Sequence, residues 1–156
     1  MSFRVGLGVD AHAFEDGVPL VLAGVAFDSP RGLAGHSDGD VITHALIDAV
    51  LGAAGLADIG SLFPSDGSTP AGVSSLDLLR AALDQVREAG WSVVNADCIL
   101  IGQEPRIADR RGELERALTD LVGAPVSVRA TTTDGLGFTG RGEGLAAQAV
   151  ALVERP

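Results

Sequence analysis

The sequence predicts a single α+β domain in which helices are laid on one β-sheet. Its 156 residues suit one domain with a substantial core and leave little room for two. Segments with strand and helix patterns mix without strict alternation, which favours one layer of helices on one sheet. No internal repeat, low-complexity tract or linker divides the chain.

Composition and charge exclude several classes of protein. Hydrophobic residues make up 46% of the chain and charged residues 21%, which argues against disorder. The net charge of −10 argues against nucleic-acid binding, and no apolar run approaches the roughly 20 residues that a membrane-spanning helix needs. The single cysteine, Cys98, excludes an intramolecular disulfide, and Met1 begins no signal-peptide pattern. We therefore expect a cytoplasmic protein without a membrane or nucleic-acid partner.

Four segments have the pattern of β-strands. Residues 3–10 alternate and are rich in valine and leucine, and residues 18–27 form a second extended region with a bend at Gly24. Residues 91–101 predict a buried strand and residues 125–131 a shorter one. Residues 32–39 and 55–72 are expected to be loop or irregular.

Four further segments have the pattern of helices. Asp38 or Asp40 caps the first, which runs to about residue 54. Ser74 or Ser75 caps the second, which stops at Gly90. Residues 108–122 predict an amphipathic helix, and we assign residues 142–153 to a last helix.

Asp10, His12 and His44 form a candidate metal site. Residues two apart on a strand point to the same face, so Asp10 and His12 can converge on one ion. His44 completes a three-ligand set if the first helix packs near that strand, and three protein ligands with a vacant position are typical of catalytic zinc. Asp40 or Asp48, each four residues from His44, can orient its imidazole.

The alternative for these histidines is ordinary packing or solvation, and an Asp-x-His pair also arises by chance. All three histidines of the chain, including His36, fall in one short window beside acidic residues, which favours the metal site. His36 lies in the polar segment 35–40 with Ser37 and Asp38. That segment suits a turn and a helix cap, but a cap needs no imidazole, so His36 is a candidate for stabilising developing charge.

The last candidate motif is a segment rich in threonine and glycine. Threonine occupies positions 131–133, and five glycines lie between residues 135 and 144. Such a loop lets backbone N–H groups approach an anion closely, although a tight turn alone explains some of the glycines. The segment lacks a Walker A lysine, and its G-x-G-x-x-G spacing does not belong to a βαβ unit.

Taken together, these motifs resemble the 2-C-methyl-D-erythritol 2,4-cyclodiphosphate synthase family over nearly the whole chain. The four matching motifs are G-x-G-x-D-x-H-x-F at residues 6–14, G-H-S-D-G-D-V at 35–41 with H-A and D-A following, D-I-G and F-P at 58–64, and A-T-T-T through F-T-G-R-G-E-G at 130–144. The resemblance implies one cyclodiphosphate synthase domain over residues 1–156. It also implies an α/β sandwich with a mixed sheet covered on one face by helices, assembled as a homotrimer with active sites between subunits.

The implied reaction converts 4-diphosphocytidyl-2-C-methyl-D-erythritol 2-phosphate into the cyclic diphosphate and CMP, in the non-mevalonate route to isoprenoid precursors. The resemblance assigns one zinc ion per subunit to Asp10, His12 and His44. It assigns Mg²⁺ or Mn²⁺ to the substrate diphosphate, with Asp134 as a possible ligand, and transition-state stabilisation to His36 and Thr132.

The resemblance also assigns substrate contacts. The methylerythritol phosphate side comprises Ser37, Asp58, Ile59, Gly60, Phe63, Pro64, Ser65, Asp66 and Gly67. The cytidine side comprises Gly102, Gln103, Glu104, Pro105, Arg106, Ile107, Ala108, Thr131, Thr133, Phe138 and Arg141. Arg141 and Glu143 match positions beside a cavity on the trimer axis that can hold an isoprenoid diphosphate. The chain departs from the usual family residues at Ser65, Arg106, Asp134 and Gly135.

Two other functions use the same residues. A zinc hydrolase acting on a phosphate ester needs the same three metal ligands and an activated water. A non-catalytic trimer that captures isoprenoid diphosphates needs the fold but no zinc, which leaves three converging ligands without a purpose.

Overall fold

The computed structural model describes residues 1–156 as one α+β domain. Its strands are β1 (Ser2–Asp16), β2 (Leu20–Leu22), β3 (Val25–Phe27), β4 (Arg31–Leu33), β5 (Ser92–Ile101), β6 (Val126–Thr131) and β7 (Gly144–Arg155). Its helices are α1 (Val41–Ala54), α2 (Ile59–Leu62), α3 (Ser75–Glu88), the 3-10 turn η1 (Ala108–Arg110), α4 (Arg111–Val122) and α5 (Gly137–Gly140). None of these helices has the length and hydropathy to cross a membrane.

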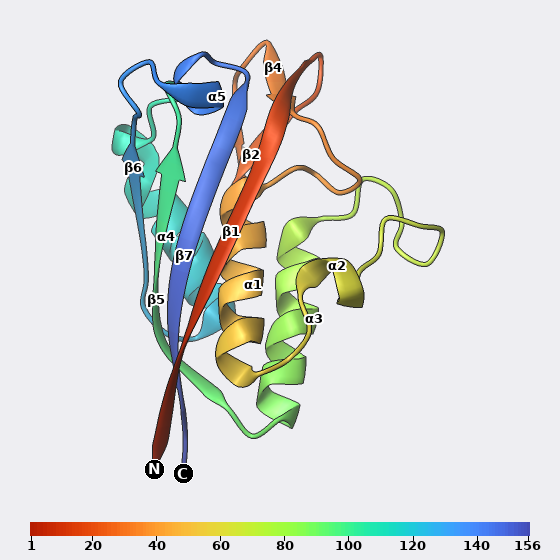
Figure 1. Ribbon diagram of the computed structural model, residues 1–156, viewed down its shortest axis with the longest axis vertical. Coiled ribbons are helices and arrows are strands. Elements are labelled where there is room, and N and C mark those ends of the chain that lie inside the picture. The colour runs from red at the N-terminus through yellow and green to blue at the C-terminus, as the bar shows by residue number, and fades with distance from the viewer.

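The main sheet is mixed, with the strand order β4-β1-β7-β5-β6. The long strands β1 and β7 are antiparallel neighbours from Ser2↔Arg155 to Ala13↔Gly144, so the two chain ends lie together (Figure 1). β5 is antiparallel to β7 and parallel to β6. The helices α1 and α4 pack behind these strands, and α3 packs on α1 (Figure 1). The expected layer of helices on one face of a mixed sheet is confirmed.

The prediction of a last helix over residues 142–153 is wrong, because β7 occupies this segment. Alanine is the strongest helix former, and the segment holds four alanines, which made a helix plausible locally. Alternate residues are nevertheless buried: Leu145, Ala147, Ala149, Ala151 and Val153. Pairing with β1 on one side and β5 on the other satisfies both backbone edges, and this tertiary context overrides the local preference.

Close contact between β1 and α1 places the first helix against the sheet. A Cβ atom on Gly8 would lie 1.8 Å from the carbonyl oxygen of Ala45, and one on Gly6 would lie 2.0 Å from that of Ala49. Only glycine therefore fits at these two strand positions. The contact sets the α1 backbone directly on the strand at Ala45, one residue after His44.

The other predicted elements hold with changed boundaries. β1 continues six residues beyond residue 10, because β7 and then β4 pair with its second half. Residues 18–27 fold into the β2–β3 hairpin, whose turn residues Ala23 and Gly24 both have positive φ. Asp40, rather than Asp38, caps α1 by accepting from the Thr43 N–H. Ser74 occupies the N-cap position of α3 without a side-chain hydrogen bond. The short elements β4, α2 and α5 lie in segments expected to be loop.

The face of the sheet turned away from the helices carries a set of exposed apolar side chains. These side chains are Phe3, Val5, Leu7, Val9 and Val150, each at least 45% exposed. The neighbouring strands β1 and β7 contribute all of them. Patches of this kind on a single chain mark contact surfaces.

Candidate metal centre

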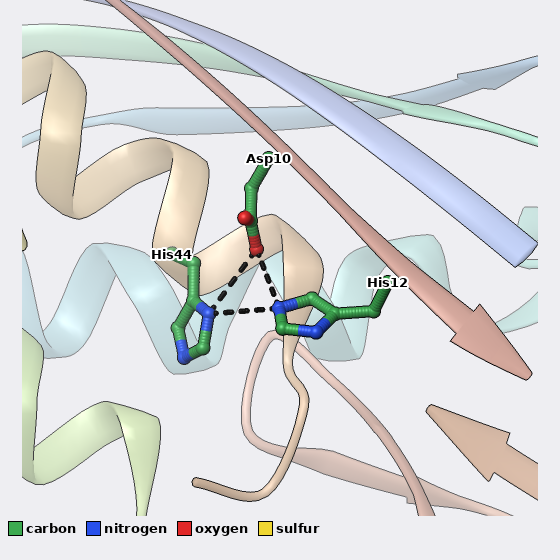
Figure 2. Close-up of side chains that lie close together, drawn as sticks. All are labelled: Asp10, His12 and His44. Carbon is green, nitrogen blue, oxygen red and sulfur yellow. Dashed lines mark hydrogen bonds and ion pairs between the residues drawn. The ribbon is translucent and has the colours of Figure 1, made fainter. Parts of the chain in front are cut away.

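Three side chains from two elements converge at one point. Asp10 and His12 project from the same face of β1, and His44 projects from α1 toward them (Figure 2). Asp10 Oδ2 lies 2.8 Å from His12 Nε2 and 3.1 Å from His44 Nδ1, and the two ring nitrogens are 3.2 Å apart. The structure thus brings together the three residues that the spacing predicted.

The size of this triangle suits a small tetrahedral ion. Ligands about 2.0–2.1 Å from a zinc ion lie about 3.3 Å from one another in a tetrahedron. The three observed separations of 2.8, 3.1 and 3.2 Å need to open only slightly to match. One carboxylate and two imidazoles are also a donor set that zinc accepts.

The second nitrogen of each ring has a protein partner. His12 Nδ1 donates to the Ala34 carbonyl oxygen at 2.6 Å, which leaves its Nε2 lone pair facing the site. His44 Nε2 lies 2.7 Å from Ser75 Oγ and 3.0 Å from Ser37 Oγ, and its Nδ1 faces the site. Both rings are therefore held in orientations that suit a metal ligand.

The sequence expectation that Asp40 or Asp48 orients His44 is wrong. Asp40 is fully buried and accepts instead from the backbone N–H groups of Ala23 and Gly24 and from Thr43. Asp48 accepts from the Ile59 N–H at 2.8 Å. Spacing along the helix placed both carboxylates near the imidazole, but stronger competition from backbone donors turned them away.

The charges within the triad stabilise one another. Burial pushes the pKa of Asp10 upward, but hydrogen bonds and charges from His12 and His44 outweigh it and lower the pKa from 3.8 to about 2. The hydrogen bond from Asp10 raises the pKa of His12 above 6.5, against the opposing effect of burial. Asp10 is therefore an anion at neutral pH, as a metal ligand must be.

A cavity of about 160 Å³ opens beside the triad. Besides Asp10, His12 and His44, its lining includes six residues predicted to touch substrate or its transition state: His36, Ser37, Ile59, Gly60, Phe63 and Ser65. Asp58, Pro64, Asp66 and Gly67 belong to the same loop but do not line the cavity. Thr69, Val73 and Leu78 line it and were not predicted, because the residues 69–78 carry no motif that marks them.

His36 is held over this cavity by the chain opposite. Its Nε2 donates to the Thr69 carbonyl oxygen at 2.6 Å, and the Gly72 N–H donates back to the His36 carbonyl at 2.7 Å. In the neutral ring, Nδ1 is then a hydrogen-bond acceptor. The loop from Phe63 to Val73 is thereby fastened to the segment that carries His36.

The remaining predicted residues form a second group at the ends of β5 and β6. The Gly102 N–H donates to the Thr131 carbonyl oxygen at 3.0 Å, which brings the two proposed cytidine segments together. Thr132 Oγ1 donates to Asp134 Oδ1 at 3.1 Å, in a turn where Asp134 has a φ of 53°. Arg141 pairs with Glu143 at 2.8 Å. No residue between 102 and 108 or between 131 and 143 lines the cavity beside the triad.

The two groups are separated by the architecture of the sheet. β7 lies between β1, which carries Asp10 and His12, and β5, which leads into residues 102–108. Within one chain the metal triad and the threonine-rich turn therefore do not form one pocket.

Comparison with known proteins identifies relatives over the whole chain. The model of the YgbB family matches residues 3–154. A 2-C-methyl-D-erythritol 2,4-cyclodiphosphate synthase from Cutibacterium acnes is 52% identical over 156 residues, covering 99% of this chain and 93% of the relative.

Solved structures agree with the fold. A 2C-methyl-D-erythritol-2,4-cyclodiphosphate synthase in a CDP-bound form superposes with a TM-score of 0.88 at 37% identity, covering 97% of this chain and 100% of that one. The bifunctional IspDF from Campylobacter jejuni gives a TM-score of 0.94 at 39% identity. This chain is covered to 99% in that match but spans only 43% of the bifunctional chain.

Proposed function

Because the chain belongs to the YgbB family of 2-C-methyl-D-erythritol 2,4-cyclodiphosphate synthases, we propose that it catalyses the synthase reaction. The substrate is 4-diphosphocytidyl-2-C-methyl-D-erythritol 2-phosphate. An oxygen of the 2-phosphate forms a bond to the β-phosphorus, and the bond from that phosphorus to the bridging oxygen of the α-phosphate breaks. The products are the cyclic diphosphate and CMP. The observation that carries the proposal is the triad of Asp10, His12 and His44 at the cavity.

Positioning and charge neutralisation are the main demands of such a phosphoryl transfer. Asp10, His12 and His44 would hold a zinc ion, which when bound supplies a positive charge for phosphate oxygens. Ser37, Ile59 and Phe63 line the wall of the cavity, where they would position the methylerythritol phosphate. The chain supplies no nucleophile, because the substrate attacks itself.

His36 and Thr132 are proposed to stabilise the charge that develops on the transferred phosphorus. The Thr69 carbonyl takes the Nε2 hydrogen of His36, so the ring donates a second hydrogen bond from Nδ1 only as the imidazolium. Thr132 lies at the end of β6 with an exposed hydroxyl beside Asp134. Asp134 would bind the Mg²⁺ or Mn²⁺ that accompanies the substrate diphosphate.

A homotrimer would complete the site. The cavity beside the triad and the turn that carries Thr132 lie apart in one chain. The open apolar face of β1 and β7 provides a surface on which three copies can associate. The cytidine contacts of residues 102–108 and 131–133 would then come from the neighbouring subunit. The CDP-bound relative supports a cytidine ligand for this group.

Arg141 and Glu143, which pair with each other, are proposed to lie near the trimer axis. An isoprenoid diphosphate on that axis would be a regulatory ligand, separate from the substrate.

A phosphorus NMR assay tests the proposed reaction. Purified protein with the cytidyl-diphosphate substrate, zinc and magnesium is expected to yield the cyclic diphosphate and an equal amount of CMP. His44→Ala removes one of three proposed ligands and should abolish turnover. A linear phosphate product with CMP would instead establish the zinc hydrolase. Absence of turnover by the folded wild-type trimer with zinc bound would favour the non-catalytic binding protein.

A further inference from the structure

The outer side of the His44 ring is held by a residue that no motif marked. Ser75, the first residue of α3, is fully buried, and its Oγ lies 2.7 Å from His44 Nε2. It belongs to a different element from all three proposed metal ligands. The contact therefore joins α3 to the metal site through a single hydroxyl.

Asp38 accepts two hydrogen bonds from Ser75. The Ser75 N–H donates to Asp38 Oδ2 at 3.0 Å, and the Ser75 hydroxyl donates to Asp38 Oδ1. The Asp40 N–H also donates to Asp38 Oδ1, at 3.1 Å. A carboxylate accepts hydrogen bonds and donates none, so the hydroxyl hydrogen of Ser75 must point to Asp38.

This direction determines where the hydrogen of His44 lies. Because the Ser75 hydrogen goes to Asp38, its oxygen presents only lone pairs to His44, and Nε2 must be the donor. The neutral imidazole then keeps its lone pair on Nδ1, the atom that faces Asp10 and His12. The order of donors is therefore His44 to Ser75 to Asp38.

Ser37 is the competing partner of the same nitrogen, at 3.0 Å. Without Ser75, the Ser37 hydroxyl can donate to Nε2 and hold the ring in the tautomer whose hydrogen points into the metal site. With Ser75 in place, Nε2 has its acceptor at the shorter distance, and the Ser37 hydrogen is free to point into the cavity that Ser37 lines.

We propose that Ser75 and Asp38 are positioning residues that fix the orientation and tautomer of His44 for metal binding. The inference rests on the proposed function, because it requires a metal ion at the triad. Carboxylates commonly act directly on the second nitrogen of a metal-bound histidine. Here a buried serine stands between the carboxylate and the ring. Loss of such a partner typically weakens metal binding about 10–100-fold.

Zinc affinity measures this role without reference to catalysis. Metal-free wild type and Ser75→Ala are titrated with zinc in competition with a chromophoric chelator, and Ser75→Ala is expected to bind at least about 10-fold more weakly. Ser74→Ala is the matched control, since Ser74 is the adjacent serine and makes no side-chain cap bond. It should bind zinc as tightly as wild type.

The spectrum of cobalt bound in place of zinc separates positioning from general destabilisation. Ser75→Ala should shift the visible absorption bands, because the His44 ring is no longer held. A variant that merely unfolds more easily would show a lower melting temperature of the metal-free protein with the bands unchanged. Equal zinc affinity and identical cobalt bands in Ser75→Ala and wild type would overturn the inference.

Asp38→Asn provides a second test if Ser75→Ala does not fold. The amide oxygen in this variant can still accept from the Ser75 hydroxyl, but the amide NH₂ group cannot accept from the Ser75 N–H. One of the two hydrogen bonds is therefore lost, and zinc affinity should fall by a smaller factor than in Ser75→Ala. If Asp38→Asn bound zinc as tightly as wild type, the positioning role proposed for Asp38 would be refuted. If wild type itself binds no zinc, the metal centre in the proposed function fails, and this inference fails with it. Zinc binding by wild type without turnover would leave the inference standing.

Discussion

At the scale of single residues, the site depends on how each histidine nitrogen is occupied. The Ala34 carbonyl accepts from His12 Nδ1, and the hydroxyl of Ser75 faces His44 Nε2, so the remaining nitrogens face Asp10. The sequence alone identified Asp10, His12 and His44, since their spacing on a strand and a helix is visible locally. It missed Ala34 and Ser75 as partners of the rings, because they lie 22 residues from His12 and 31 residues from His44.

The raised pKa of His12 predicts opposite effects of pH on the metal-free and zinc-bound protein. A raised folded-state pKa contributes stability that is fully present below the unfolded value of 6.5 and is lost as pH rises through the folded value. With a chelator present to remove metal, the stability advantage of wild type over His12→Gln should therefore shrink as pH rises from the unfolded pKa of 6.5 through the higher folded pKa. Thermal unfolding of both proteins across this range measures it.

Zinc reverses the direction, because the metal needs the unprotonated ring. While His12 remains protonated in the metal-free protein, zinc affinity should rise about tenfold per pH unit and then level off above the folded pKa. Chelator competition at several pH values checks this slope. A zinc affinity that is flat from about pH 6 upward would show that His12 releases no proton on binding.

At the scale of elements, the contact of α1 with β1 sets the geometry of the triad. Gly6 and Gly8 let the strand touch the helix backbone at Ala49 and Ala45. His44 comes immediately before Ala45 in α1, so this contact places it beside the strand. The alternating small residues of β7 extend the same flat surface, with Ala147 and Ala149 buried on the helix side. Helix and strand thus approach closely enough for side chains from both to reach one ion.

Gly8→Ala should disrupt both stability and zinc binding. The new Cβ would lie 1.8 Å from a backbone oxygen of α1, so the helix must move away from the strand. We expect a loss at or above the upper end of the about 1–3 kcal/mol typical of overpacking, with weakened zinc affinity. Denaturant unfolding and zinc titration measure the two effects.

Gly52→Ala is the matched control for that substitution. Gly52 is an exposed residue of the same helix, and a Cβ there meets no atom within 4 Å. Alanine should stabilise the helix by about 0.5–1 kcal/mol and leave zinc affinity unchanged. Equal behaviour of the two variants would mean that the close contact does not position the site.

At the scale of the whole molecule, the uncovered sheet face and the divided site both support the proposed homotrimer. Helices bury one face of the sheet, whereas the other exposes Phe3, Val5, Leu7 and Val9 along β1. The cavity at the triad lacks the threonine-rich turn, which lies beyond β7 in the same chain. Association through the open face would bury the apolar side chains and supply the missing group from a neighbour.

Leu7→Glu should dissociate this assembly. A carboxylate at a position that is 63% exposed in the single chain costs little in the monomer but is unfavourable in a buried apolar interface. Light scattering should find wild type at three times the chain mass of 15.8 kDa and the variant at one. Turnover should fall in the dissociated variant, while its zinc affinity per chain stays near the wild-type value.

Arg116→Glu on α4 is the control for introducing a glutamate, since it alters an exposed residue on the helix-covered side. It should remain trimeric. A trimeric Leu7→Glu variant would place the subunit contact elsewhere on the surface.

The sequence by itself determined the domain class, four extended segments, three helices and the three residues of the triad. These follow from local causes: side-chain periodicity, helix caps, and the two-residue and four-residue spacings that place side chains on one face. Only the tertiary structure decided that residues 144–155 form a strand, because alanine favours a helix until two neighbouring strands pair with it. It alone showed that Ser75 and Asp38 support His44, since 37 residues separate these two side chains and no local pattern encodes a contact made by packing α3 against α1.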